Sequence, residues 1–172
     1  IEDRMNAEND IRDVGVQAVL LIEDSIRFYS SVLPHLFKYL LKQSKDFSTE
    51  ALNEHEMMLR MRGRPKVLLA RDYEEARRLF ERYGDNMLGI ISDVRFPLGG
   101  EKNPGAGLKF ASMVRKKNPF LPIIMESSEA ENRDKVRESG YVFLDKNSKT
   151  LPQDLRDAVE KHFGFGDFIV TY

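Results

Sequence analysis

Five short runs of apolar residues recur along the chain, separated by longer stretches in which apolar positions follow a helical period. The runs cover residues 18–22, 67–70, 88–92, 121–125 and 142–144. None of them alternates apolar and polar positions, which is typical of strands that are covered on both faces. The pattern therefore predicts buried parallel strands joined by right-handed crossovers through helices.

Helical periodicity predicts a helix after each of these five strands. The predicted helices cover residues 25–40, 73–83, 106–117, 129–139 and 152–163. Pro34 lies within the first helix, and because proline removes a backbone donor we expect a kink near Leu33. Strands and helices that alternate in this way predict an α/β fold with a doubly wound five-stranded parallel sheet.

The stretch between residues 43 and 66 is longer than a crossover needs and carries the signals of an extra helix. Ser48 or Thr49 is a candidate N-cap, and Gly63 follows the predicted end. The basic residues near that end indicate a solvated face that complements the helix dipole. A partner-docking surface is the alternative.

Composition narrows the class of protein. A chain of 172 residues with 41% hydrophobic and 32% charged positions can bury one sizeable core. Its net charge of −1 gives no field that would attract nucleic acid or an anionic membrane. The lack of cysteine excludes disulfides and thiolate metal sites. No apolar run approaches the roughly 18 residues that cross a bilayer, and no signal-peptide pattern opens the chain, so we expect a cytoplasmic protein.

Acidic residues follow two of the predicted strands. The run 18–22 is followed by Glu23 and Asp24, and the run 88–92 by Asp93. In a sheet of order 2-1-3-4-5, the carboxyl ends of the first and third strands form the switch point at which ligands collect. Three carboxylates at this point are costly to ionise without a cation, which predicts a hard metal ion with oxygen ligands, best met by Mg²⁺.

A hydroxyl and an amine are expected beside these acids. Ser127 and Ser128 follow the fourth predicted strand, and Lys146 follows the fifth. In these places they would bind an anion that reaches Asp93. Taken alone, Ser127 has the features of a helix cap and Lys146 those of a solvated lysine.

Over Val16–Phe163 the chain resembles the receiver domains of two-component response regulators. Besides the acids, Pro97 and the pair Gly107-Leu108 fall where that family has a proline and a glycine followed by an aliphatic residue. The resemblance implies a flavodoxin-like (CheY-like) fold with strand order 2-1-3-4-5, here with an extra helix between helix 1 and strand 2.

The resemblance also implies roles for the acids. In receiver domains an acid pair after the first strand and an aspartate after the third bind Mg²⁺, together with a backbone carbonyl two residues beyond that aspartate. The matching positions are Glu23, Asp24, Asp93 and Arg95. Asp93 is then the phosphoacceptor, which becomes an aspartyl phosphate.

Other positions match the residues that respond to the phosphoryl group in that family. Its Ser/Thr after the fourth strand corresponds to Ser127, its lysine after the fifth to Lys146, and its switch aromatic to Phe143. The resemblance implies that the Ser127 hydroxyl moves inward to the phosphoryl group. Phe143 then rotates into the vacated space, which couples a local charge change to a two-state packing element.

Several positions depart from the family pattern. The loop after Asp93 is longer than usual, Asn147 replaces a common proline, and Glu126 occupies a normally apolar strand position. Arg95 and Glu129 match positions that tune dephosphorylation. An ion pair between them is expected to cover the site in part and to lengthen the phosphorylated state.

The leading interpretation is a phosphoacceptor domain of a two-component phosphorelay, served by a sensor histidine kinase or phosphotransfer protein and acting on a fused or separate output module. The alternative is a pseudo-receiver used for protein interaction or homodimerisation. An enzyme is the third interpretation, but residues 99–107 lack the Gly-Lys-Ser/Thr of a P-loop. Arg95 also stands where haloacid-dehalogenase-type phosphotransferases have a second aspartate. We therefore expect self-phosphorylation and autodephosphorylation only.

The predicted domain organisation has three parts. Residues 1–15 form a tail from a preceding module, residues 16–163 the receiver domain, and residues 164–172 a linker. The long insertion and the glycine- and phenylalanine-rich end resemble receiver regions of large bacterial proteins that continue into a pyruvate phosphate dikinase or phosphoenolpyruvate synthase-like module.

Overall fold

The computed structural model describes residues 7–13, 15–45 and 65–163. Its main sheet has five strands in the order β2-β1-β3-β6-β7, and all neighbouring pairs are parallel. The strands are β1 (Ala18–Ile22), β2 (Lys66–Ala70), β3 (Met87–Asp93), β6 (Ile123–Ser127) and β7 (Val142–Asp145). When only the five strands of this sheet are counted along the chain, the order is 2-1-3-4-5. The predicted fold class is therefore confirmed.

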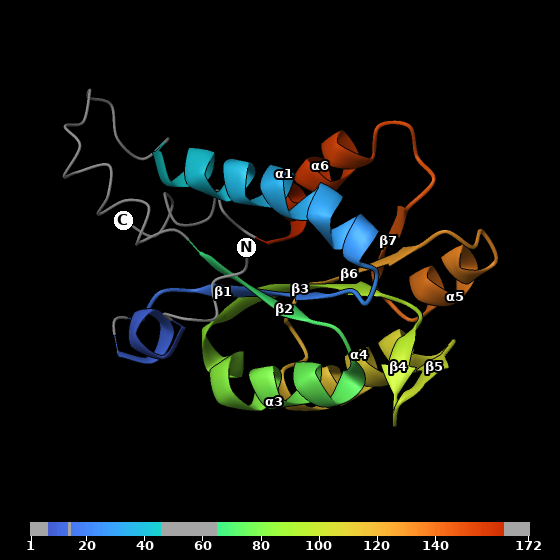
Figure 1. Cartoon of the computed structure of the whole chain (residues 1–172), viewed down its shortest axis with the longest axis horizontal. Coiled ribbons are helices and arrows are strands. Elements are labelled where there is room, and N and C mark those ends of the chain that lie inside the picture. Colours follow the sequence, from blue (N-terminus) through green and yellow to red (C-terminus); the bar gives the residue numbers. More distant parts are fainter. Residues whose placement is uncertain (1–6, 14, 46–64, 164–172) are drawn as a thin grey trace.

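Helices cover both faces of this sheet (Figure 1). One layer holds α1 (Ile26–Lys45) and α6 (Leu151–His162), and the opposite layer holds α3 (Tyr73–Tyr83) and α4 (Ala106–Lys117). The short helix α5 (Asn132–Glu138) lies beside β6 and β7, and the 3₁₀ turn η3 (Gly84–Asn86) leads into β3. The arrangement has three layers, with the sheet in the middle.

Successive strand residues enter two separate hydrophobic cores, one on each face of the sheet. On β1, Leu20 joins the core under α3 and α4, whereas Leu21 joins the core under α1 and α6. Both are fully buried. Because side chains alternate between the faces of a strand and both faces are covered, the strand sequences show no apolar–polar alternation.

The central strand β3 is fitted closely to the end of α6. A Cβ added at Gly89 would overlap the ring of Phe163, which is buried in the core under α1 and α6. Only glycine leaves room for this aromatic ring against the sheet. The contact ties the last described residue to the strand that ends in Asp93.

Two predicted element boundaries were wrong. The fourth sheet strand begins at Ile123, two residues later than predicted, and it follows Pro122, which has no backbone N–H to give to the ladder. Helix α5 begins at Asn132 and not at residue 129. The reason is that Glu129 donates its N–H to the Ser127 hydroxyl, which folds residues 129–131 into a turn.

Helix α1 begins at Ile26, as expected from the candidate N-cap Ser25, and continues through Pro34 to Lys45. The extra helix predicted within 43–66 falls mainly on residues 46–64, which lie outside the described residues. The predicted linker 164–172 lies outside them too.

A short antiparallel hairpin, which the sequence pattern did not predict, follows β3. Its strands are β4 (Phe96–Leu98) and β5 (Glu101–Asn103), joined by Gly99 and Gly100 with φ of 66° and 86°. These positive φ values suit a two-residue hairpin turn and favour glycine. Figure 1 shows the hairpin next to α4, beyond the sheet edge at which β3 ends.

The segment before β1 packs against the sheet layer. It contains the π-helix η2 (Glu8–Asp13), and Ala7 and Ile11 are fully buried in the core under α3 and α4. Asp10 pairs with the buried Lys66 at 3.4 Å, and Glu8 accepts hydrogen bonds from Arg82 and Tyr83. The predicted domain boundary near residue 15 remains a prediction, but residues 7–13 belong to the packed fold.

None of the helices in the described ranges combines the length and the apolarity needed to cross a bilayer.

Candidate functional site

Three neighbouring strands end in acidic side chains at the same level of the sheet. Ile22 of β1 lies beside Ser92 of β3, so Glu23 is brought beside Asp93. Asp93 in turn lies beside Glu126 of β6. The Glu23 N–H extends the β1–β2 ladder by donating to Ala70 O at 2.9 Å, which fixes this residue in line with the strand. The predicted convergence of Glu23 and Asp93 is therefore present.

The end of β3 is also held from the α4 side. The Gly107 N–H donates to Val94 O at 2.9 Å. A Cβ at Gly107 would overlap the Asp93 carbonyl oxygen and come within 2.8 Å of Val94 Cα. Glycine at this position allows the first turn of α4 to lie against the backbone that carries Asp93.

Glu23, Asp24 and Asp93 have the spacing of a cation site. One carboxylate oxygen from each lies within 4.8 Å of the others, and this is the only group of His, Asp or Glu with such spacing in the described ranges. Asp24 Oδ1 is buried and has no hydrogen-bond partner in the described part of the chain. An orphaned buried carboxylate oxygen beside two further carboxylates fits a hard divalent ion such as Mg²⁺.

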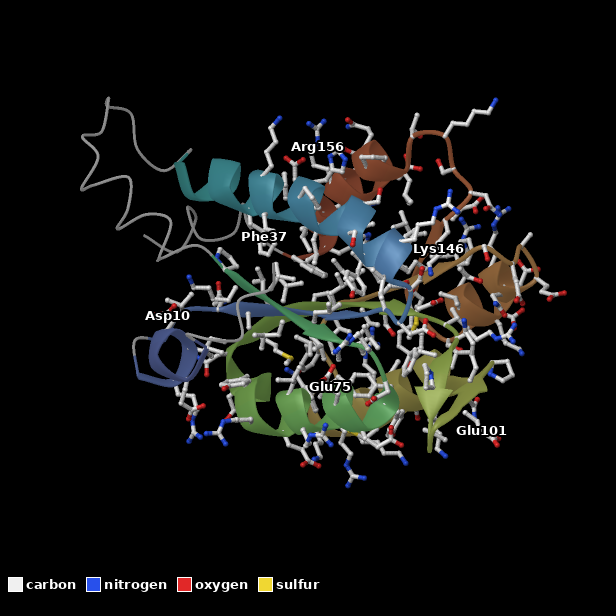
Figure 2. The ribbon with its side chains drawn as sticks, in the orientation of Figure 1. Asp10, Phe37, Glu75, Glu101, Lys146 and Arg156 are labelled. Atoms are coloured by element: carbon white, nitrogen blue, oxygen red, sulfur yellow. The ribbon has the colours of Figure 1, made fainter. Side chains whose placement is uncertain are left out.

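Lys146 provides the counter-charge at the centre of this group. Its ammonium lies 2.6 Å from Glu23 Oε2 and 2.9 Å from Asp93 Oδ2, and its side chain is only 13% exposed. The ring of Phe28 on α1 covers the ammonium, with the centroid 4.2 Å from Nζ. Figure 2 shows Lys146 beside the first turns of α1, at the end of the sheet. The lysine predicted to flank the acids is thus in contact with two of them.

Burial and charge shift the pKa values of these groups. Burial raises the pKa of Glu23 and of Asp93, while the Lys146 charge and hydrogen bonds oppose the rise. Burial by itself lowers the pKa of Lys146, but the charges of Asp93, Glu126 and Glu23 outweigh it and raise the pKa overall. The ammonium therefore remains charged and stabilises ionised carboxylates in a partly desolvated place.

Glu126 adds a further carboxyl below this site. It is fully buried, and neither of its oxygens has a donor among the described residues. Burial, followed by the charge of Glu23, raises the pKa of Glu126 well above its usual value. These surroundings favour the neutral form of the Glu126 carboxyl, which lies beside Glu23.

Ser127 caps the loop that leads into α5. Its hydroxyl accepts from the Glu129 N–H at 3.0 Å and from Asn132 Nδ2 at 2.9 Å. The backbone of the same residue accepts from the Lys146 N–H at 3.0 Å, which aligns the ends of β6 and β7. Ser127 therefore holds the turn before α5 and is not its N-cap, which is Glu131 and has no side-chain cap hydrogen bond. A role of Ser127 toward an anion at Asp93 remains a prediction.

A pocket of about 170 Å³ opens above these groups, and its lining includes Asp93, Ser127 and Lys146. Two ion pairs stand at its mouth, each with an exposed basic side chain. Arg95 pairs with Glu129 at 3.5 Å, as the sequence predicted, and Lys102 pairs with Asp24 at 3.5 Å.

The position of Arg95 is fixed in part through its backbone. The Arg95 N–H donates to Asp93 Oδ1 at 3.3 Å, so one carboxylate oxygen of Asp93 faces the following loop and the other faces Lys146. The role of the Arg95 carbonyl as a metal ligand remains a prediction.

Phe143 is half-buried on β7, and the guanidinium of Arg133 lies 5.7 Å from its ring centroid. This contact links the aromatic ring to α5. Whether the ring changes position remains a prediction.

Two residues of the site could not be assigned from sequence. Lys102 reaches the pocket only because the hairpin folds back, and the Gly99-Gly100 pair is the one signal that indicates its turn. Phe28 lies in the first helix, and its contact with Lys146 has no separate signal in the sequence.

Comparison with known proteins adds to this geometry. No protein-family model and no curated protein matches the sequence. Solved structures do match. A response regulator receiver protein from Sinorhizobium medicae is 16% identical, with a TM-score of 0.60 over 88% of this chain and 97% of that chain. The chain has the fold of a response regulator receiver domain.

Two further receiver structures agree. A response regulator receiver domain protein from Clostridium thermocellum is 18% identical, with a TM-score of 0.56 over 90% of this chain and 99% of that one. A chain of the CheX–CheY–BeF₃–Mg complex from Borrelia burgdorferi is 15% identical, with a TM-score of 0.58 over 88% of this chain and 93% of that one. Since receiver chains are matched almost completely, the similarity extends over the whole sheet and its helices.

Proposed function

We propose that this chain is a phosphoacceptor domain that receives a phosphoryl group on Asp93. One observation carries the proposal: the Asp93 carboxylate lines a pocket with a buried ammonium at 2.9 Å and two further carboxylates at cation-binding distance. This combination supplies a nucleophile, a fixed positive charge and the ligands of a divalent ion.

The transfer itself needs little covalent chemistry from the protein. An Asp93 oxygen forms a bond to phosphorus while the bond from phosphorus to the donor's leaving group breaks, and the leaving group departs with the electron pair. With an acyl phosphate as donor, the leaving group is a carboxylate and no proton has to move. Asp93 must be ionised for this step, and Lys146 favours the ionised form by direct hydrogen bonding.

Glu23, Asp24, Asp93 and the backbone carbonyl of Arg95 are the groups that would hold Mg²⁺. When bound, Mg²⁺ would neutralise negative charge on the carboxylates and on the phosphoryl oxygens. If Glu23 served as a ligand of the cation, Lys146 would lose this partner, and its ammonium would be available to bind a phosphoryl oxygen. The solved Borrelia burgdorferi complex contains BeF₃ and Mg, which supports this chemistry for a protein of the same fold.

The switch that would follow involves β6, β7 and α5. The Ser127 hydroxyl has to leave Glu129 and Asn132 to reach a phosphoryl oxygen, which loosens the turn before α5. Phe143 and Arg133 pack together beside this turn and are the groups placed to respond. We propose that a sensor histidine kinase or phosphotransfer protein supplies the phosphoryl group. The switched surface would act on an output module, and a fused pyruvate phosphate dikinase or phosphoenolpyruvate synthase-like module is one proposal for it.

The test is incubation of the purified chain with Mg²⁺ and acetyl phosphate, followed by intact-mass analysis. We expect the gain of one phosphoryl group that hydroxylamine removes, since an acyl phosphate reacts with this nucleophile. Asp93→Asn should abolish the gain, and Asp85→Asn, at an exposed position in the turn η3 before β3, should not. A wild-type protein that neither gains the group nor binds beryllofluoride with Mg²⁺ would contradict the proposal.

A second candidate function is a pseudo-receiver that serves protein interaction. The observation that favours it is that the acids already have internal counter-ions: Lys146 pairs with Glu23 and Asp93, and Lys102 pairs with Asp24. These pairs neutralise part of the negative charge of the site without a metal. Retention of oligomeric state and partner binding in Asp93→Asn, with no modification of the wild type, would favour this function.

A further inference from the structure

We propose that Lys102, presented by the β4–β5 hairpin, is a second phosphoryl-binding cation that faces the donor across the pocket from Lys146, and that it gives up Asp24 when a divalent ion binds. The inference rests on the proposed phosphoacceptor function. It assigns a role to a residue that lies in the lengthened loop after Asp93, where the receiver resemblance supplies no counterpart.

The hairpin holds Lys102 in a defined place. Phe96 is fully buried against α3 and α4, and the Gly99 N–H donates to Glu74 Oε1 of α3 at 2.6 Å. The base and the turn of the hairpin are therefore both attached to the helical layer. The position of Lys102 is thus fixed by a hairpin that is attached to α3 and α4.

The register of the hairpin directs Lys102 to the pocket. Phe96 and Leu98 pack on the core under α3 and α4, so Pro97, which lies between them, faces the other way. Residues directly opposite each other in an antiparallel pair share a face. Lys102 lies opposite Pro97, on that second face. The pocket lining includes Lys102, in agreement with this alternation.

The pairing of Lys102 with Asp24 is one that can be exchanged. The two charged atoms are 3.5 Å apart and the lysine side chain is 51% exposed, so the pair is weak. Asp24 is more enclosed, with a side chain 19% exposed and a buried Oδ1 that has no partner among the described residues. A divalent ion that binds Asp24, Glu23 and Asp93 would neutralise the carboxylate that now holds Lys102.

The released ammonium meets a need of the reaction. A phosphodonor brings a dianionic group to a pocket whose floor carries carboxylates, and those carboxylates repel it. Lys146 lies on the inner side of the pocket, and Lys102 stands at its mouth. A phosphoryl group held between two ammonium groups is aligned before Asp93 attacks it.

The proposal predicts two effects of opposite sign for Lys102→Gln. Affinity for Mg²⁺, measured by calorimetry without any donor, should rise about two- to fivefold, because a competing and repelling charge is removed. The rate of phosphorylation by acetyl phosphate at saturating Mg²⁺ should fall by a similar factor. Lys102→Arg should keep both values close to wild type, and the exposed Lys109→Gln on α4 serves as the matched control.

The outcomes separate this inference from the proposed function. A wild type that forms no acyl phosphate overturns the proposed function, and the inference with it. A wild type that is phosphorylated, with an unchanged rate or an unchanged Mg²⁺ affinity in Lys102→Gln, overturns the inference alone. A loss of both affinity and rate would indicate a structural role for the hairpin, and it also overturns the inference. Raised salt should narrow the difference in rate between wild type and Lys102→Gln.

Discussion

The Lys146 ammonium donates to Glu23 Oε2 across 2.6 Å, although the two residues are 123 positions apart in the sequence. Glu23 follows the inner strand β1, and Lys146 follows the edge strand β7. The contact therefore passes over β3 and β6 and links the carboxyl ends of the sheet at the level of Asp93. The contribution of this contact to the free energy of unfolding can be measured without any phosphorylation reaction.

We predict that Lys146→Met lowers the free energy of unfolding by about 3 kcal/mol in metal-free buffer, because it leaves buried carboxylates without a partner. Urea denaturation measures this loss. Added Mg²⁺ should reduce the difference in unfolding free energy between Lys146→Met and wild type, since a bound cation replaces the missing charge. The exposed Lys149→Met is the control, and an equal loss in both variants would contradict the prediction.

We predict that Glu126→Leu raises the stability at neutral pH by about 1–2 kcal/mol, because the buried carboxyl has no donor among the described residues. Position 126 suits an apolar side chain, because all residues of β6 are buried. Chemical denaturation of both proteins gives the difference. A variant less stable than wild type would show that the carboxyl contributes a stabilising contact.

The pH dependence of Glu126 has a defined sign. Its pKa in the folded protein is raised well above 4.5, so the neutral form is favoured by folding. The unfolded chain releases this proton near its ordinary pKa, and between the two pKa values the unfolded state binds fewer protons. The stabilisation is complete below the ordinary pKa and is lost as pH rises. Stability of Glu126→Gln relative to wild type should therefore increase from about pH 5 to pH 8, and a constant difference would contradict the raised pKa.

We predict that Gly107→Ala costs about 2 kcal/mol or more, because the added methyl group overlaps the Asp93 carbonyl oxygen and the backbone there cannot yield easily. Gly105→Ala is the matched control, since its Cβ would meet Asn103 Oδ1 at an ordinary 3.6 Å. Thermal denaturation of the two variants compares them directly. Similar stability of both would show that α4 can move away from β3 at little cost.

We predict that Arg95→Ala shortens the lifetime of the phosphorylated state, because the Arg95–Glu129 pair stands at the mouth of the pocket and hinders the approach of water to Asp93. Decay of the phosphorylated mass after removal of the donor measures the lifetime. Glu129→Ala should act in the same direction, and the double variant should add little to either. An unchanged lifetime in Arg95→Ala would contradict this role.

The sequence was sufficient for the parts of the fold that depend on simple burial. The strand β1 lies where the apolar run 18–22 predicted it, since both of its faces are covered. The proximity of Glu23 and Asp93 could also be predicted, because each follows a strand and those two strands meet at the switch point of this strand order. The ion pair between Arg95 and Glu129 was also predicted, and the structure confirms it.

The remaining features depend on contacts that leave little trace in local sequence. The strands of the β4–β5 hairpin have three residues each, too few to show a period. The place of Lys102 depends on that hairpin's register. The boundary of α5 depends on a hydrogen bond to Ser127, which the spacing of apolar residues does not report.

The close fit of Phe163 against Gly89 bears on how precisely Asp93 is placed. Gly89 and Asp93 are four positions apart on the same strand. Because the aromatic ring leaves no room for a Cβ at Gly89, a larger residue there would push β3 away from α6 and displace the carboxylate that the strand carries.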